Sequence, residues 1–247
     1  MRDPYLYPGS MVLRNQLDIH DEDALNLAEA ELSRASMMLM YEQGFTDFSS
    51  QGFQKIHKTL FGDVYDWAGE FRSINIQKAE IQLGGRSVWY SNTNDIERDL
   101  NIAWRKINEI DWKDLSKEDF AKQLSRRFPP LWQVHPFREG NTRSVVMLIT
   151  FFVEHHGYYF VQELLSASAK YVRDSFVLAC IDSKYAEFEH LERILNDAVS
   201  LEPIEYVDDL DGDIDLQPSE KYSKYQSDEE YRPTPHEYRS DGPELTM

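Results

Sequence analysis

Apolar residues recur every three or four positions through most of the chain before residue 200, which predicts a mainly helical protein. The segment 21–43 shows this pattern clearly, with apolar residues at Leu25, Ala28, Leu32, Ala35 and Leu39. Gly44 follows and is a suitable helix end. Similar spacing predicts further helices that begin near Ser49, Asp95, Ser116, Ser144, Val161, Ala169 and Lys184. The last of these is expected to run to Ser200.

The spacing changes between Arg72 and Asn92, a segment that we call the flap. Its apolar residues alternate with polar ones, and Gly84-Gly85 offers a tight turn. This pattern predicts a short β-hairpin within a helical protein. An isolated hairpin has unpaired edges, so it either packs on the helices or pairs with another chain.

Both ends of the chain differ from the helical region. Residues 1–20 are predicted to form an extended arm that is held on the protein by Tyr5, Leu6 and Tyr7. Residues 201–247 contain fourteen acidic and only four basic residues, together with five prolines. This composition predicts a disordered acidic tail. The expected organisation is one domain, residues 1–200, followed by the tail, 201–247.

Composition limits the kinds of partner. The net charge of -18 argues against a general nucleic-acid binder, because phosphate neutralisation needs clustered Lys and Arg. Cys180 is the only cysteine and stands in an apolar run, so a buried inert thiol is expected. No apolar signal region is found near Met1, and the longest apolar run, Val145–Val153, is too short to span a bilayer. We therefore expect a cytoplasmic protein without membrane contact.

The chemistry concentrates in residues 135–143, His-Pro-Phe-Arg-Glu-Gly-Asn-Thr-Arg, directly before that apolar run. Gly140, Asn141 and Thr142 stand where a helix should begin, and N–H groups at a helix start have no helical partner. They can therefore donate to an anion such as phosphate. Arg143 adds a planar fork that suits phosphate oxygens.

Two further groups extend this set. Glu139 is the hard oxygen ligand that Mg²⁺ prefers when it also binds nucleotide phosphates. His135 is a suitable general base for a hydroxyl nucleophile. Together these groups are typical of phosphoryl or nucleotidyl transfer. A zinc site is a weak alternative, because Pro136 and Gly140 disfavour one continuous helix and no third ligand is evident. His57, on an apolar helix face, is interpreted as a structural histidine.

The stretch closely resembles the signature of Fic-domain proteins, His-x-Phe-x-(Asp/Glu)-Gly-Asn-(Gly/Lys)-Arg-x-x-Arg. The resemblance extends to Tyr5–Gly9, Ile56–Phe61 and Asp66–Gly69 and to the flap, and it covers residues 3 to 200 or so. The chain looks like the stand-alone bacterial Fic toxins in particular. The resemblance implies an all-α helical bundle with a β-hairpin flap.

Most characterised Fic proteins transfer AMP from ATP to a Ser, Thr or Tyr hydroxyl of a target protein. By position, the resemblance implies that His135 deprotonates this hydroxyl and that Glu139 holds Mg²⁺. It implies an anion hole made by Gly140, Asn141 and Thr142, with Arg143 on the outer phosphates. The flap would bind the target segment by strand addition. Its candidate docking residues are Ile76, Gln77, Lys78 and Leu83.

The sequence departs from the signature at two positions. Thr142 replaces the Gly of AMP-transferring members and the Lys of Doc-type kinases, so a Doc-like protein kinase stays an alternative. Val146 replaces the final Arg, which leaves open a catalytically weak binding module. That Arg normally pairs with the Glu of an inhibitory (Ser/Thr)-x-x-x-Glu-(Gly/Asn) helix. Residues 183–188 fit five of its six positions but are expected inside a structural helix, so a small separate antitoxin is the expected inhibitor.

Overall fold

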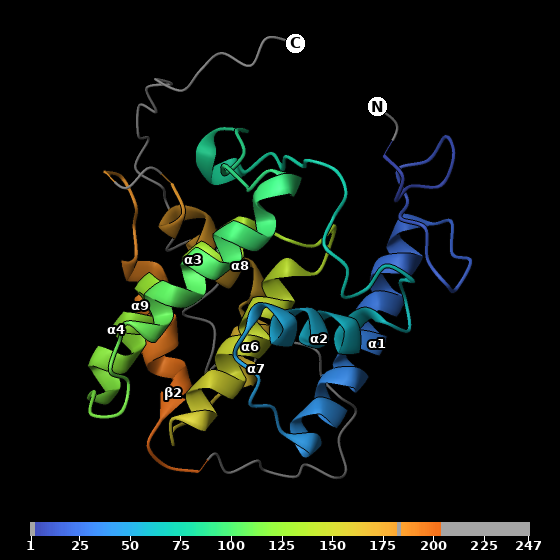
Figure 1. Ribbon diagram of the computed structural model, residues 1–247. Helices are drawn as coiled ribbons and strands as arrows, with labels where there is room; N and C mark the ends of the chain where they lie inside the picture. The colour runs from blue at the N-terminus through green and yellow to red at the C-terminus, as the bar shows by residue number, and fades with distance from the viewer. Residues whose placement is uncertain (1–2, 182–183, 204–247) are drawn as a thin grey trace.

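The computed structural model describes residues 3–181 and 184–203. Apart from residues 201–203, the predicted acidic tail lies outside the described residues. The helices are α1 (Glu22–Gln43), α2 (Ser50–Phe61), α3 (Ile96–Asn108), α4 (Lys117–Arg127), α5 (Pro129–Val134), α6 (Asn141–His155), α7 (Gln162–Ala167), α8 (Ala169–Ala179) and α9 (Glu189–Ala198). Strands β1 (Tyr159–Phe160) and β2 (Val199–Ser200) form one antiparallel pair. The predicted helical fold class is therefore confirmed (Figure 1).

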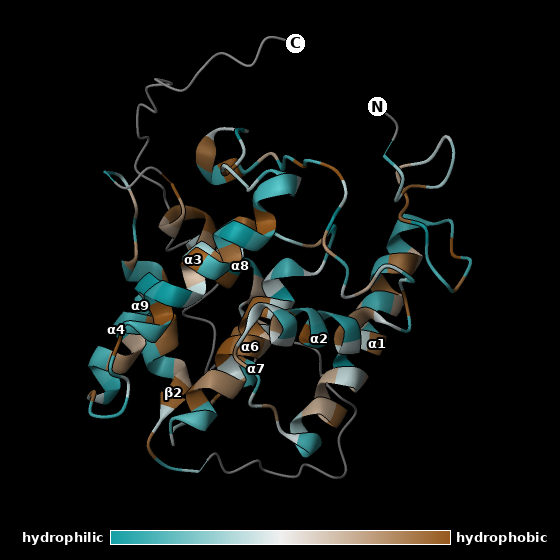
Figure 2. Ribbon diagram, in the orientation of Figure 1, coloured by the Kyte–Doolittle hydropathy of each residue, from teal (hydrophilic) through white to brown (hydrophobic). Residues whose placement is uncertain are grey.

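Helix α6 lies at the centre of the bundle and contacts α2 and α5 (Figure 1). Its apolar residues surround the helix axis, and Figure 2 shows much of the helix in the hydrophobic colour. A helix that is apolar on all sides is stable only when neighbours cover it. The buried set is Val145, Met147, Leu148, Ile149, Phe151, Phe152 and Val153. The candidate loop at the start of α6 is thus attached to a helix whose apolar residues are buried in the core.

Local capping residues fix the starts of several helices. The side chains of Asp21, Ser49 and Ser116 accept hydrogen bonds from backbone N–H groups in the first turns of α1, α2 and α4. Such caps satisfy donors that have no helical partner. Gly44 ends α1 with a positive φ of 67°. These boundaries agree with those predicted from the sequence.

The predicted break at Pro129-Pro130 is also found, but the prolines begin a new helix. Helix α4 ends at Arg127, and α5 starts at Pro129. Proline is well suited to a first helical turn because its missing N–H would have no partner there.

The last helix begins five residues later than predicted, at Glu189 rather than at Lys184. The Glu187 N–H donates to the carbonyl of Leu178 at 3.1 Å, which ties this segment to the end of α8. The segment that resembles the inhibitory motif is therefore not helical from Lys184 to Phe188, contrary to expectation. Its first residue, Ser183, lies outside the described residues.

The flap reverses direction as predicted, but no strand is assigned to it. Glu80 N–H donates to Arg86 O at 3.0 Å, and the short 3-10 helix η1 (Ile81–Leu83) forms the tip. Side chains form hydrogen bonds with backbone groups that would otherwise pair between the strands of a β-hairpin. Ser87 Oγ accepts from the N–H of Lys78, and Arg72 binds carbonyl groups at both ends of the flap. A second short 3-10 helix, η2 (Thr93–Asp95), leads into α3.

The N-terminal arm folds back on itself instead of staying extended. Tyr7 N–H donates to Val12 O at 3.0 Å, and Arg14 N–H donates to Tyr5 O at 2.7 Å. The Tyr5 ring packs edge-on against Trp67 at 5.4 Å, so this residue does hold the arm on the protein, at the segment after α2.

The thiol of Cys180 is inert, as expected. Cys180 is buried, its thiol donates to Pro129 O at 3.3 Å, and burial raises its pKa. Such a thiol is unreactive. None of the described helices combines the length and apolar composition that crossing a bilayer requires.

The close approach of α2 to the preceding loop gives a test of this packing. A Cβ at Gly52 would lie 1.7 Å from the backbone oxygen of Asp47. We expect Gly52→Ala to lower the free energy of unfolding by about 1–3 kcal/mol, because the backbone must move. Urea denaturation measures this loss. Gln51→Ala, at an exposed neighbouring position, is the control, and equal stability of the two variants would contradict the predicted clash.

Candidate functional site

The loop from His135 to Gly140 joins α5 to α6, and left-handed residues stand at both of its ends. His135 has a φ of 50°, and Gly140 has a φ of 76°. Glycine is required at 140 for a second reason, because a Cβ there would lie 2.4 Å from Cε2 of Phe61. The sharp turn at Gly140 directs the chain into α6 and leaves the first N–H groups of the helix at the loop.

Asn141 fixes the shape of the loop. Its Oδ1 accepts from the N–H of Phe137 at 2.9 Å, and its Nδ2 donates to the carbonyl of Phe137 at 2.8 Å. The first helical hydrogen bond of α6 runs from Ser144 N–H to Gly140 O. The N–H groups of residues 141–143 consequently have no acceptor within the helix, as an anion site requires.

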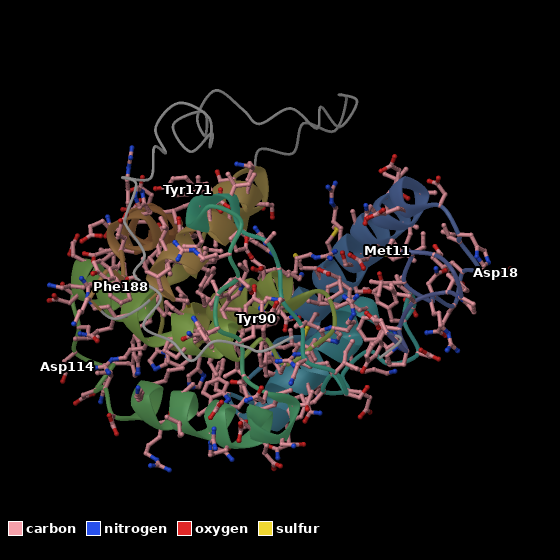
Figure 3. The ribbon with its side chains drawn as sticks, turned by 90° about the horizontal axis from the view of Figure 1, so that it is seen from above. Met11, Asp18, Tyr90, Asp114, Tyr171 and Phe188 are labelled. Atoms are coloured by element: carbon pink, nitrogen blue, oxygen red, sulfur yellow. The ribbon has the colours of Figure 1, made fainter. Side chains whose placement is uncertain are left out.

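His135 is buried, with 3% of its surface exposed. Tyr90, near the centre of the view in Figure 3, stacks on its ring at 4.1 Å. Nδ1 lies 3.2 Å from the carbonyl of Trp132, which can only accept, so Nδ1 carries the proton. Nε2 is then an acceptor, and no partner for it is found among the described residues. Burial and the charge of Lys78 lower the pKa of His135 well below its usual value, so the ring is neutral.

Glu139 is ionised and lies between the flap and α6. Its Oε2 is 3.2 Å from Nζ of Lys78, and its Oε1 accepts from Gly140 N–H at 3.1 Å. Burial alone would raise its pKa, but Lys78 and the N–H of Gly140 outweigh that effect, and the pKa falls to about 2. No cluster of three or more metal-binding side chains occurs in the described parts of the chain. A single ionised carboxylate fits Mg²⁺ only if phosphates supply further ligands.

Arg143 is directed toward α1. Its guanidinium forms an ion pair with Glu29, contacts Ser33 Oγ at 3.3 Å and lies over the ring of Phe61. Glu29 also accepts from the hydroxyl of Tyr65. Sequence reasoning missed Glu29, although an acidic residue beside an apolar helix face is a signal for a buried partner.

The two residues that depart from the Fic signature, Thr142 and Val146, both contact neighbouring parts of the protein. Thr142 Oγ1 accepts from Nε1 of Trp132 at 2.8 Å, which orients its side chain toward α5. Val146 is partly buried against the core.

Sequence reasoning also missed Arg72, which joins the flap to the loop. Its Nε donates to His135 O at 2.8 Å, and its other nitrogens donate to the carbonyls of Ile74, Ser91 and Val134. Arg72 is buried, and five guanidinium hydrogens allow one side chain to reach several carbonyl groups. No local sequence pattern indicates such a role, because all of its partners except Ile74 are distant in the chain.

His57 supports the same loop from the other side. Its Nε2 donates to Glu139 O at 3.0 Å, Gly69 N–H donates to its Nδ1 at 2.8 Å, and its ring stacks on Phe137 at 3.9 Å. Burial lowers the pKa of His57 to about 4. His57 is therefore a structural histidine, as predicted, and it supports the loop of the candidate site.

The four candidate docking residues of the flap have different surroundings. Gln77 is exposed and Ile76 is half-buried. Lys78 faces Glu139, and Leu83 is buried in the core. The flap therefore presents only part of the predicted docking set at its surface.

We expect Arg72→Met to destabilise the protein by about 2–5 kcal/mol. The substitution leaves buried carbonyl groups of the flap and the loop without donors. Chemical denaturation measures the loss, and Arg105→Met, at an exposed position on α3, provides a matched control. A loss no larger than that of the control would show that Arg72 does not hold the two segments together.

Protonation of His57 should make stability depend on pH. Its folded-state pKa of about 4 lies below the ordinary value of 6.5, so the unfolded state binds more protons in between. The stabilisation is present above pH 6.5 and is lost as pH falls toward 4, by about 3 kcal/mol in total. Denaturation curves across this range should have a smaller pH slope for His57→Gln than for the wild type. An unchanged slope would refute the assignment.

Comparison with known proteins supports a family assignment. The model of the Fic/DOC family matches residues 47–153. A Sinorhizobium fredii protein named Probable protein adenylyltransferase y4lH is 32% identical over 160 residues, which cover 64% of this chain and 79% of that protein. Protein adenylyltransferase VbhT of Bartonella schoenbuchensis is 28% identical over 197 residues, which cover 78% of this chain but 38% of VbhT.

Solved structures have the same fold. BepC, a VirB-translocated effector of Bartonella tribocorum with bound AMPPNP, superposes with a TM-score of 0.70 at 19% identity, over 82% of this chain and 99% of BepC. The N-terminal FIC domain of Bep8 from Bartonella sp. 1-1C gives 0.67 at 19% identity, over 78% and 93% of the two chains. Sequence identity and signature residues together show that this chain belongs to the Fic/DOC family.

Proposed function

We propose that this protein is a protein adenylyltransferase that transfers AMP from ATP to a Ser, Thr or Tyr hydroxyl of a target protein. The observation that carries the proposal is the neutral His135, which belongs to the loop that leads into α6 and whose Nε2 has no hydrogen-bond partner among the described residues. The relatives named as protein adenylyltransferases support the same activity.

The proposed reaction assigns one role to each part of the loop. The α-phosphate lies at the N-terminus of α6, where Gly140, Asn141 and Thr142 offer N–H groups. Nε2 of His135 takes the proton of the target hydroxyl as its oxygen bonds to the α-phosphorus. The bond between the α-phosphorus and the bridging oxygen breaks, and pyrophosphate leaves. Trp132 O keeps the ring oriented throughout by accepting from Nδ1.

Glu139 would hold Mg²⁺ together with the nucleotide phosphates. Its low pKa keeps it ionised at neutral pH, so no proton has to leave before a cation binds. When bound, the ion would neutralise charge that develops on the phosphates. Arg143 would contact the outer phosphates from its place against α1, where Glu29 and Ser33 hold it.

The target protein would dock on the flap. Gln77 and the half-buried Ile76 lie at its surface, so they are the residues that we propose for backbone pairing with a target segment. Leu83 would support the flap from the core rather than touch the target. We further propose that the protein acts in the cytoplasm as the toxin of a toxin–antitoxin pair, with a small separate antitoxin as its inhibitor.

Label transfer tests the activity. We expect α-³²P-ATP with Mg²⁺ to label a protein in a cell lysate, and His135→Ala to reduce labelling by about 10²- to 10⁴-fold, as loss of a general base does. His20→Ala, which changes an exposed histidine of the arm, should label normally. Label from γ-³²P-ATP but not from α-³²P-ATP would instead identify a Doc-like kinase. No labelling from either nucleotide would favour a binding module.

A further inference from the structure

The carboxylate of Glu139 occupies a position that two donors share. One oxygen accepts from the N–H of Gly140 at 3.1 Å, and the other lies 3.2 Å from the ammonium of Lys78. Gly140 stands at the start of α6, whereas Lys78 belongs to the flap and is 61 residues from Glu139 in the chain. The two segments therefore bind the same carboxylate. This carboxylate takes the position that a bound anion could take.

A phosphate oxygen has the same charge and the same acceptor character as that carboxylate oxygen. If a nucleotide phosphate takes the Gly140 N–H, then the Lys78 ammonium is within reach of it. Glu139 would at that point bind the cation that accompanies the nucleotide, and Lys78 would lose its present partner. We propose that Lys78 is a phosphate-binding residue of the nucleotide site, an inference that rests on the proposed function.

The balance of charge favours this role. Arg143 is already paired with Glu29, and position 146 carries a valine. The triphosphate of ATP therefore meets a partly neutralised guanidinium at the start of α6. A lysine that changes partner from Glu139 to phosphate supplies the positive charge without a new charged residue. Charge-assisted hydrogen bonds of this kind are stronger than neutral ones.

The surroundings of Lys78 also differ from those of a simple surface lysine. Its side chain is only 28% exposed, and its backbone N–H is held by Ser87 Oγ at 3.1 Å. Arg72 fixes the carbonyl of Ile74, four residues earlier, to the same loop that carries His135. The lysine is therefore presented to the site by ordered backbone, which reduces the entropy that binding costs.

Calorimetric titration with Mg-AMPPNP tests the proposal without any turnover. We expect Lys78→Gln to weaken binding roughly 10-fold or more, as loss of a charged hydrogen bond does, whereas Lys78→Arg retains most of the affinity. Lys106→Gln, which removes an exposed lysine of α3, is the matched control and should bind like the wild type. Adenosine, which has no phosphate, should bind the wild type and Lys78→Gln equally. Thermal unfolding confirms that each variant is folded.

Each other result has a definite meaning. Unchanged Mg-AMPPNP affinity in Lys78→Gln overturns the role of Lys78 and leaves the proposed function intact. Tighter binding overturns it as well, because Lys78 would then compete with the cation for Glu139. Equal losses for adenosine and Mg-AMPPNP would assign Lys78 a role in flap structure only. A wild-type protein that binds no Mg-AMPPNP would overturn both this inference and the proposed function.

Discussion

The side-chain amide of Asn141 determines the form of the candidate site. By accepting from the N–H of Phe137 and donating to its carbonyl, it closes the loop into a ring at the start of α6. The ring can form only because Gly140 adopts a left-handed conformation against Phe61. Glu139 lies within this closed turn and His135 lies two residues before it, so the turn positions both the imidazole and the carboxylate.

Two side chains from distant parts of the chain support the ring. His57 donates to the carbonyl of Glu139, and Arg72 donates to the carbonyl of His135. His57 has to stay neutral to form both of its hydrogen bonds, whereas Arg72 is charged at any ordinary pH. This arrangement satisfies backbone groups that the sharp turn removes from regular secondary structure.

The sequence predicted what depends on near neighbours. Ser49 and Ser116 cap helices through residues three positions away, and the residues of the 135–143 stretch are adjacent in the chain. What it missed depends on pairing between distant residues. Examples are the ion pair between Glu29 and Arg143 and the hydrogen bond from Arg72 to the carbonyl of Ser91. The hairpin was wrong in detail for the same reason. Alternating residues indicate extended backbone, but they do not reveal that the side chain of Arg72, at the start of the segment, will bind the carbonyl groups of Ile74 and Ser91.

Under the proposed function, the attachment of the flap by Arg72 separates target recognition from chemistry. The carbonyl groups of Ile74 and Ser91, near the two ends of the flap, are hydrogen bonded to the side chain that also binds the carbonyl of His135. The span between these two points is not held by Arg72. Under the proposed function, residues such as Gln77 can change to suit a different target while His135 keeps its position, so selection could alter target specificity without rebuilding the loop from His135 to Gly140.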